Sequence, residues 1–135
     1  FALLKSDYAQ SPYAPRAALA AAKLAYLKGD AAAARTELTW VIDNAKEAAL
    51  RDTAKMRLAS ILSEDKKFPE ALALIKAPEE AAFSPLFAEV RGDIQQAKGD
   101  NAAAADAYRE ALAKLPKDAP NLKLLEIKLD VLGGK

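Results

Sequence analysis

The sequence contains no cysteine and no histidine. Without cysteine there is neither a disulfide framework nor a thiol nucleophile, and the chain is compatible with an oxidising as well as a reducing compartment. The lack of histidine removes the commonest general base and metal ligand. The few glycines form no phosphate-binding loop, and no serine lies in a Gly-x-Ser-x-Gly elbow. We therefore expect no enzymatic activity, no metal site and no cofactor.

Long apolar runs and charge of one sign are also missing. No segment approaches the roughly 20 apolar residues that a membrane-spanning helix needs, and no signal peptide is visible. The chain begins at Phe1 rather than methionine, so we expect a trimmed or mature fragment whose membrane segment, if it has one, lies outside this sequence. Basic and acidic residues number 20 and 19 and are interspersed. Nucleic-acid binding needs a clustered positive field, so we expect no nucleic acid as partner.

What the chain has in abundance is alanine. Its 135 residues are enough for one domain, 52% of them are hydrophobic, and alanine has the highest helix propensity. The β-branched residues are scattered and show no sustained alternation of apolar and polar positions. The composition therefore predicts a single all-α domain over residues 1–135.

Three turns recur at nearly regular spacing. Their starts at Gly29, Lys66 and Gly99 are 37 and 33 residues apart, close to the ~34 residues of a tetratricopeptide unit. Side chains of matching size recur around them. A small residue lies seven positions before each turn start and another five after, and a large apolar or aromatic residue lies nine after: Ala22/Ala34/Leu38, Ala59/Ala71/Ile75 and Gly92/Ala104/Tyr108. The pattern predicts tetratricopeptide-like antiparallel hairpins, with an irregular helical bundle as the alternative.

The domain is expected to have five parts. They are an N-terminal stalk helix over 1–10, three repeats over 12–45, 52–78 and 85–116, and a capping helix over 121–132. The second repeat departs most from the pattern because it has no glycine at its turn and Pro78 shortens its second helix. We expect that helix and the loop after it to be the least stable part of the domain.

The first helix of each hairpin lines the concave side of a stacked array. Side chains on these helices are therefore candidates for protein binding: Arg16, Leu19, Lys23, Tyr26, Met56, Ser60, Leu86, Glu89, Asp93 and Gln96. Their order predicts a groove that is basic and aromatic at one end and acidic at the other, which would orient a peptide. The alternative is a concave face that is merely polar.

The capping helix carries two apolar stripes on nearly opposite faces. One consists of Leu122, Leu125, Leu129 and Leu132, and the other of Leu124, Ile127 and Val131. A solvated cap needs one apolar face, so the second stripe is either buried, which we favour, or a second protein contact.

Three segments of the sequence together resemble a known family. They are SPYAPRAALAAAKLAYLKGD, LTWVIDNAKEAALRDTAKMRLASIL and AEVRGDIQQAKGDNAAAADAYREAL. The chain resembles, from Ser11 to about Leu132, the periplasmic domain of the tetratricopeptide-like ancillary subunit of the bacterial Sec translocon. The most specific piece is Trp40 to Ala45, followed by the helix that contains Arg57, Leu58 and Ala59. The SPYA opening also occurs in other envelope repeat proteins.

The resemblance implies a function and a location. Members are single-span inner-membrane proteins whose repeat domain lies in the periplasm, so residues 1–10 would connect the domain to a membrane helix. Their implied partners are the Sec translocon and a membrane-anchored periplasmic chaperone of the prolyl-isomerase-like type, and they help to pass secreted chains to chaperones. Two alternatives stay open: an envelope-assembly scaffold of the outer-membrane lipoprotein type, and a cytosolic peptide-binding co-chaperone.

Overall fold

A computed structural model describes residue 11 and residues 13–133, and every regular element in this part of the chain is helical. The elements are α2 (Tyr13–Leu27), α3 (Ala31–Asn44), α4 (Ala48–Glu64), α5 (Phe68–Leu74), the short 3-10 helix η1 (Ala81–Phe83), α6 (Ser84–Lys98), α7 (Asn101–Lys114) and α8 (Leu122–Val131). The predicted all-α, tetratricopeptide-like fold is confirmed. The stalk helix predicted over residues 1–10 lies outside the described residues.

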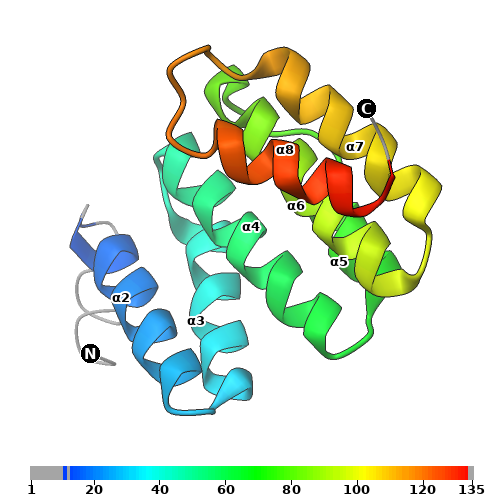
Figure 1. The fold of residues 1–135 in the computed structure, drawn as a ribbon. Coiled ribbons are helices and arrows are strands. Elements are labelled where there is room, and N and C mark those ends of the chain that lie inside the picture. Colours follow the sequence, from blue (N-terminus) through cyan, green and yellow to red (C-terminus); the bar gives the residue numbers. More distant parts are fainter. Residues whose placement is uncertain (1–10, 12, 134–135) are drawn as a thin grey trace.

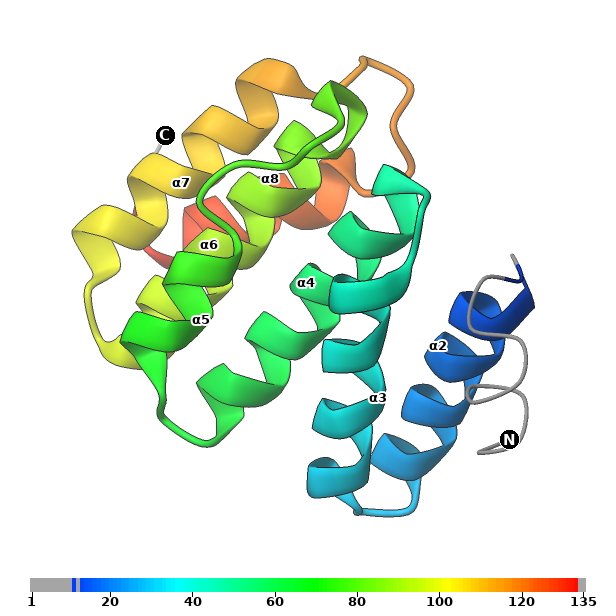
Figure 2. The same ribbon diagram turned by 180° about the vertical axis from the view of Figure 1, so that it is seen from behind.

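Consecutive helices pair into three antiparallel hairpins. Helix α2 packs on α3, α4 on α5 and α6 on α7, and α8 then packs against α7. Contacts of α4 with α3 and with α6 join the hairpins in a row, from the α2–α3 end to the α6–α7 end, where α8 lies beside α7 and across α6 (Figure 1; Figure 2 shows the same row from behind). The array therefore has one side formed mainly by the first helices of the hairpins.

The three hairpins share one turn geometry. Gly29, Lys66 and Gly99 each adopt a left-handed backbone conformation, with φ of 84°, 59° and 96°. In each turn the next N–H donates to a carbonyl five residues back: Asp30 to Ala25, Lys67 to Leu62 and Asp100 to Gln95. This is the bonding of a Schellman motif, which ends a helix and usually places glycine at the left-handed position. The sequence register that aligned Lys66 with two glycines is therefore seen in the backbone.

The caps after these turns differ in strength. The carboxylates of Asp30 and Asp100 each accept a hydrogen bond at 3.0 Å, from the N–H groups of Ala33 and Ala103. These bonds satisfy one of the donors left unpaired at a helix start. Lys67 occupies the same position before α5 and provides no side-chain cap. Helix α5 thus begins without a side-chain cap, as α4 and α6 do, and at 7 residues it is the shortest of the six helices that form the hairpins.

The connection between the first two hairpins is shorter than the sequence suggested. The predicted repeats, 12–45 and 52–78, left residues 46–51 as the connection, but α4 begins at Ala48. Ala48 and Ala49 favour helix, and the side chain of Leu50 packs on the first hydrophobic cluster. Burial of Leu50 thus extends the helix by about one turn at its N-terminus.

The loop after α5 is tied to the start of α4. Asp52 is fully buried, and its two carboxylate oxygens accept hydrogen bonds at 3.0 Å from the backbone N–H groups of Glu79 and Glu80. The guanidinium of Arg51 donates two 2.7 Å hydrogen bonds to the Glu79 carboxylate and a third, at 2.6 Å, to the Ala45 carbonyl. The loop is thus anchored by charge-assisted hydrogen bonds.

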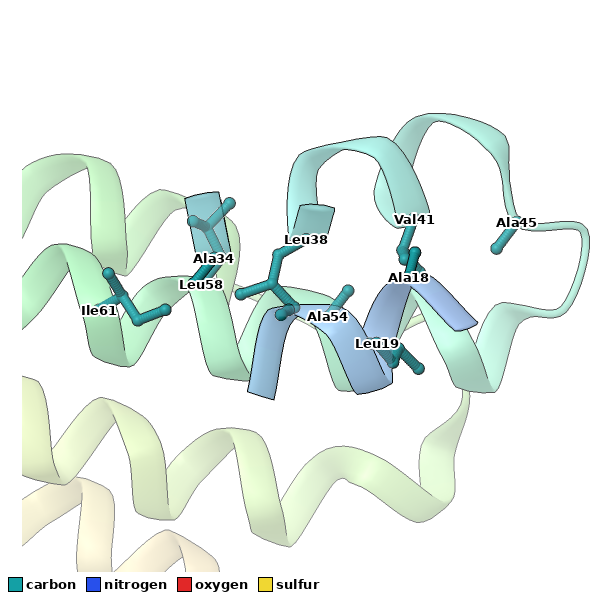
Figure 3. Packing of buried hydrophobic residues seen from close by; sticks show 10 residues of the cluster. Ala18, Leu19, Ala34, Leu38, Val41, Ala45, Ala54, Leu58 and Ile61 are labelled. Atoms are coloured by element: carbon teal, nitrogen blue, oxygen red, sulfur yellow. The ribbon is translucent and has the colours of Figure 1, made fainter. Parts of the chain in front are cut away.

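The hydrophobic core of the first half lies between α2, α3 and α4. Leu38 and Val41 of α3 meet Ala18 of α2 and Ala54 of α4 in this cluster, which Figure 3 shows from close by. Leu19 belongs to the same cluster and is only 8% exposed. Its assignment to the binding groove was therefore wrong. Helix α2 packs against both α3 and α4, so its buried face is wider than a single hairpin requires.

Candidate binding surface

A concave pocket of about 320 Å³ lies between the first helices of the three hairpins. Its apolar lining consists of Ala22, Leu38, Met56, Ile61 and Val90, and its polar lining of Lys23, Tyr26, Arg57, Ser60 and Glu64. An apolar hollow with a few polar groups at its edge is the usual form of a recognition site. Four of the predicted groove residues, Lys23, Tyr26, Met56 and Ser60, come together here.

One side of the pocket is closed by a hydrogen bond between α2 and α4. The Tyr26 hydroxyl donates to the Glu64 carboxylate across these two helices. This hydrogen bond is the main reason that the pKa of Tyr26 is raised above its ordinary value, because ionisation of the phenol would place two negative charges together. The pair fixes the spacing of α2 and α4 at this edge and engages the one acidic side chain of the lining.

The predicted acidic end of the groove is not free. Lys128 of α8 forms ion pairs with Glu89 at 2.8 Å and with Asp93 at 3.0 Å. The Asn121 amide donates to Glu89 at 2.9 Å, and the Tyr108 hydroxyl donates to Asp93 at 2.6 Å. The side chain of Glu89 is only 13% exposed. The expectation of an open acidic end is therefore corrected: α8 folds over these carboxylates and neutralises them.

The pKa values of Lys128 and Tyr108 reflect these contacts. Burial works against the charged form of Lys128, but hydrogen bonds to Glu89 and Asp93 outweigh it and raise the pKa of Lys128. Burial, together with the hydrogen bond to Asp93, raises the pKa of Tyr108. Both groups therefore keep their protons at neutral pH, which is the state that the contacts with the two carboxylates require.

The remaining predicted groove residues lie away from the pocket lining. Arg16 forms a bidentate pair with Glu47 at 3.1 and 3.2 Å on the surface. Leu86 is partly exposed near the start of α6. Gln96 accepts a hydrogen bond from the Tyr108 hydroxyl at 3.2 Å. These three side chains do not form one continuous site with Lys23 and Met56.

Six lining residues were not among the predicted groove residues: Ala22, Leu38, Arg57, Ile61, Glu64 and Val90. Arg57 lies three residues before Ser60 and Glu64 four residues after it, so the helical spacing on α4 could have identified both. Val90 reaches the pocket from α6 because α6 packs beside α4. No local pattern reports that contact between helices.

The second stripe of α8 is exposed. Leu124, Ile127 and Val131 are 52%, 49% and 72% exposed, whereas Leu125 and Leu129 of the first stripe are buried. The favoured expectation that both stripes are buried was wrong. The three exposed residues remain candidates for a second contact.

Two further observations concern the described residues only. They contain no cluster of three or more His, Cys, Asp or Glu side chains that could hold a metal ion. They also contain no helix with the length and apolar character needed to cross a membrane.

Comparisons with known proteins agree with the fold. The chain is 36% identical over 129 residues to a protein of Neisseria gonorrhoeae named ancillary SecYEG translocon subunit. This alignment covers 96% of the chain and 62% of that relative, so the chain spans less than two thirds of the relative's length. Comparison with solved structures gives no significant match. The relative's name and the repeat fold point to an association with proteins rather than to catalysis. The sequence model of the tetratricopeptide repeat-like domain matches residues 1–134, and the chain belongs to this family.

Proposed function

We propose that this domain is a non-enzymatic protein-interaction module that works with the SecYEG translocon. The observation that carries the proposal is the concave pocket between α2, α4 and α6, whose apolar floor and charged rim suit a protein segment. The relative's name, which refers to the translocon, supports the choice of partner. Helical repeats bind partners through such concave surfaces.

The location and the task follow from the same proposal. The domain would lie at the periplasmic side of the bacterial inner membrane, with the full-length protein anchored there by a segment outside this chain. In that position it would contact the translocon and a membrane-anchored periplasmic chaperone, and would help to pass emerging chains to such chaperones. The resemblance of the segment around Trp40 supports this more specific role.

Crosslinking in cells tests the proposal. Photoreactive residues are placed at positions 23, 56 and 60 of the full-length protein, all of which line the pocket. A matched control carries the same residue at position 36 of α3, which lines a different hollow, between α3, α4 and α5, and not the pocket. We expect crosslinks to translocon subunits or to a periplasmic chaperone from the three pocket positions and none from the control.

Two results would contradict the proposal. Equal crosslinking from position 36 and from the pocket would show that the concave surface is not the binding site. Crosslinks from the pocket to cytosolic proteins alone would favour the co-chaperone alternative over a periplasmic role.

A further inference from the structure

The rim of the concave pocket carries positive charge that the domain does not neutralise. Lys23 of α2 and Arg57 of α4 are both exposed and both line the pocket. In the described part of the chain, neither forms an ion pair. Other cations on the surface, such as Arg16 and Arg91, are paired with acids. The two cations that face the pocket are therefore available to a ligand.

The acids near this surface are already engaged. Glu64 accepts the hydrogen bond of Tyr26. Glu89 and Asp93, farther along the first helices, are held by Lys128. The surface seen by a ligand is thus not a dipole, as the sequence suggested, but an apolar hollow whose rim carries two cations, Lys23 and Arg57, and one carboxylate, that of Glu64, which is bonded to Tyr26.

The apolar floor can adapt to different side chains. Met56, the only methionine of the chain, is partly buried in the lining. Its unbranched thioether side chain can change conformation at little energetic cost, and methionine is common on surfaces that bind varied sequences. Around it lie the buried side chains of Ala22, Leu38 and Ile61. A pocket of this volume has space for a large apolar side chain rather than for a folded element.

We propose that the pocket binds an acidic, extended segment of a partner protein, with one bulky apolar side chain inserted beside Met56 and flanking carboxylates paired with Lys23 and Arg57. This inference rests on the proposed interaction function and adds the chemistry of the partner segment. The apolar anchor supplies contact area, while the flanking charges set specificity and the rate of association. Because the two cations are exposed, salt screens their attraction, and binding weakens as ionic strength rises.

The test uses two short synthetic peptides and nuclear magnetic resonance. The first has a central phenylalanine flanked by glutamates, and the second has lysine in place of every glutamate. Each is titrated into the 135-residue chain while amide shifts are followed. We expect the acidic peptide to shift resonances of residues that line the pocket and the basic peptide to bind at least about tenfold more weakly.

Charge reversal identifies the groups responsible. The variant K23E/R57E is expected to reduce the affinity for the acidic peptide by about tenfold, since two favourable pairs become repulsive. The matched control K98E/K117E makes the same change in net charge at two exposed lysines that do not line the pocket. This control is expected to keep the affinity of the unchanged chain.

The results separate this inference from the proposed function. Equal binding of the two peptides, or equal loss in both double variants, overturns the acidic-segment inference. If crosslinks to the translocon then still come from position 56, the interaction function survives with a partner of different chemistry. If those crosslinks are absent while the acidic peptide still binds at the pocket, the proposed translocon role fails and the peptide preference stands.

Discussion

The aromatic ring of Tyr108 lies directly on the backbone of Gly92, where α6 and α7 cross. A β-carbon added to Gly92 would overlap the ring atoms Cδ1 and Cε1 and would lie 2.9 Å from Cζ. In the other two hairpins the equivalent pairs are Ala22 with Leu38 and Ala59 with Ile75, so the smaller residue accompanies the larger partner. The third hairpin has glycine because its partner is a fully buried tyrosine.

Gly92→Ala is therefore expected to destabilise the domain, although alanine has the higher helix propensity. Overpacking costs about 1–3 kcal/mol, which exceeds the ~1 kcal/mol that alanine gains over glycine in a helix. Urea unfolding followed by circular dichroism measures the difference. In a Tyr108→Leu background the ring is gone, and there Gly92→Ala should become neutral or stabilising. A loss of equal size in both backgrounds would show that the tyrosine ring is not the cause.

The turn before α5 contains a second local conflict. Lys66 has a φ of 59°, a conformation that costs a residue with a β-carbon about 1–2 kcal/mol. Lys66→Gly removes that cost but adds conformational entropy to the unfolded chain. We expect a net stabilisation of about 0.5–1 kcal/mol, visible as a higher urea midpoint with an unchanged slope. Lys66→Ala is the control and should give no such gain, since alanine keeps the β-carbon.

These two positions illustrate what the sequence could predict. The repeat register alone aligned Lys66 with Gly29 and Gly99 and placed Gly92 at the small position seven residues before a turn. Both assignments were possible because they depend on local backbone geometry. Contacts between distant segments left no such pattern. The ion pairs of Lys128 with Glu89 and Asp93 join residues 39 and 35 positions apart, so the acids of α6 appeared free when only α6 was considered.

The prediction that the second apolar stripe of α8 is buried failed for a related reason. Two apolar stripes suggested two buried faces, but the helix packs mainly on α7 and leaves Ile127 49% exposed. For the pocket, the repeat pattern predicted the helices that form it. Which side chains of α4 and α6 meet there depends on how the hairpins pack together, and local sequence patterns do not report that packing.

The buried and the exposed face of α8 should respond differently to the same substitution. Leu125 is fully buried and Ile127 is 49% exposed. Leu125→Asp places a charge in an apolar site and should cost several kcal/mol, detaching α8 from α7. Ile127→Asp should change the unfolding free energy by no more than about 0.5 kcal/mol. Thermal unfolding of the two variants compares them directly, and an equal loss of stability would show that the face of Ile127 is part of the core.

Acid should release the loop that Arg51 and Asp52 anchor. The hydrogen bonds from Arg51 lower the pKa of Glu79 from 4.5 to about 2. Since the folded pKa lies below the unfolded one, the ionised carboxylate stabilises the fold fully above pH 4.5, and this contribution disappears as the pH falls towards about 2. Unfolding free energies measured between pH 5 and pH 2 should therefore decrease with a slope that is smaller in Glu79→Gln.

Because Glu79 is 38% exposed, solvent screening limits the size of the effect, and high salt should reduce it further. Identical slopes in the two proteins would show that Glu79 has the same pKa in the folded and unfolded states, and that Asp52 holds the loop without it.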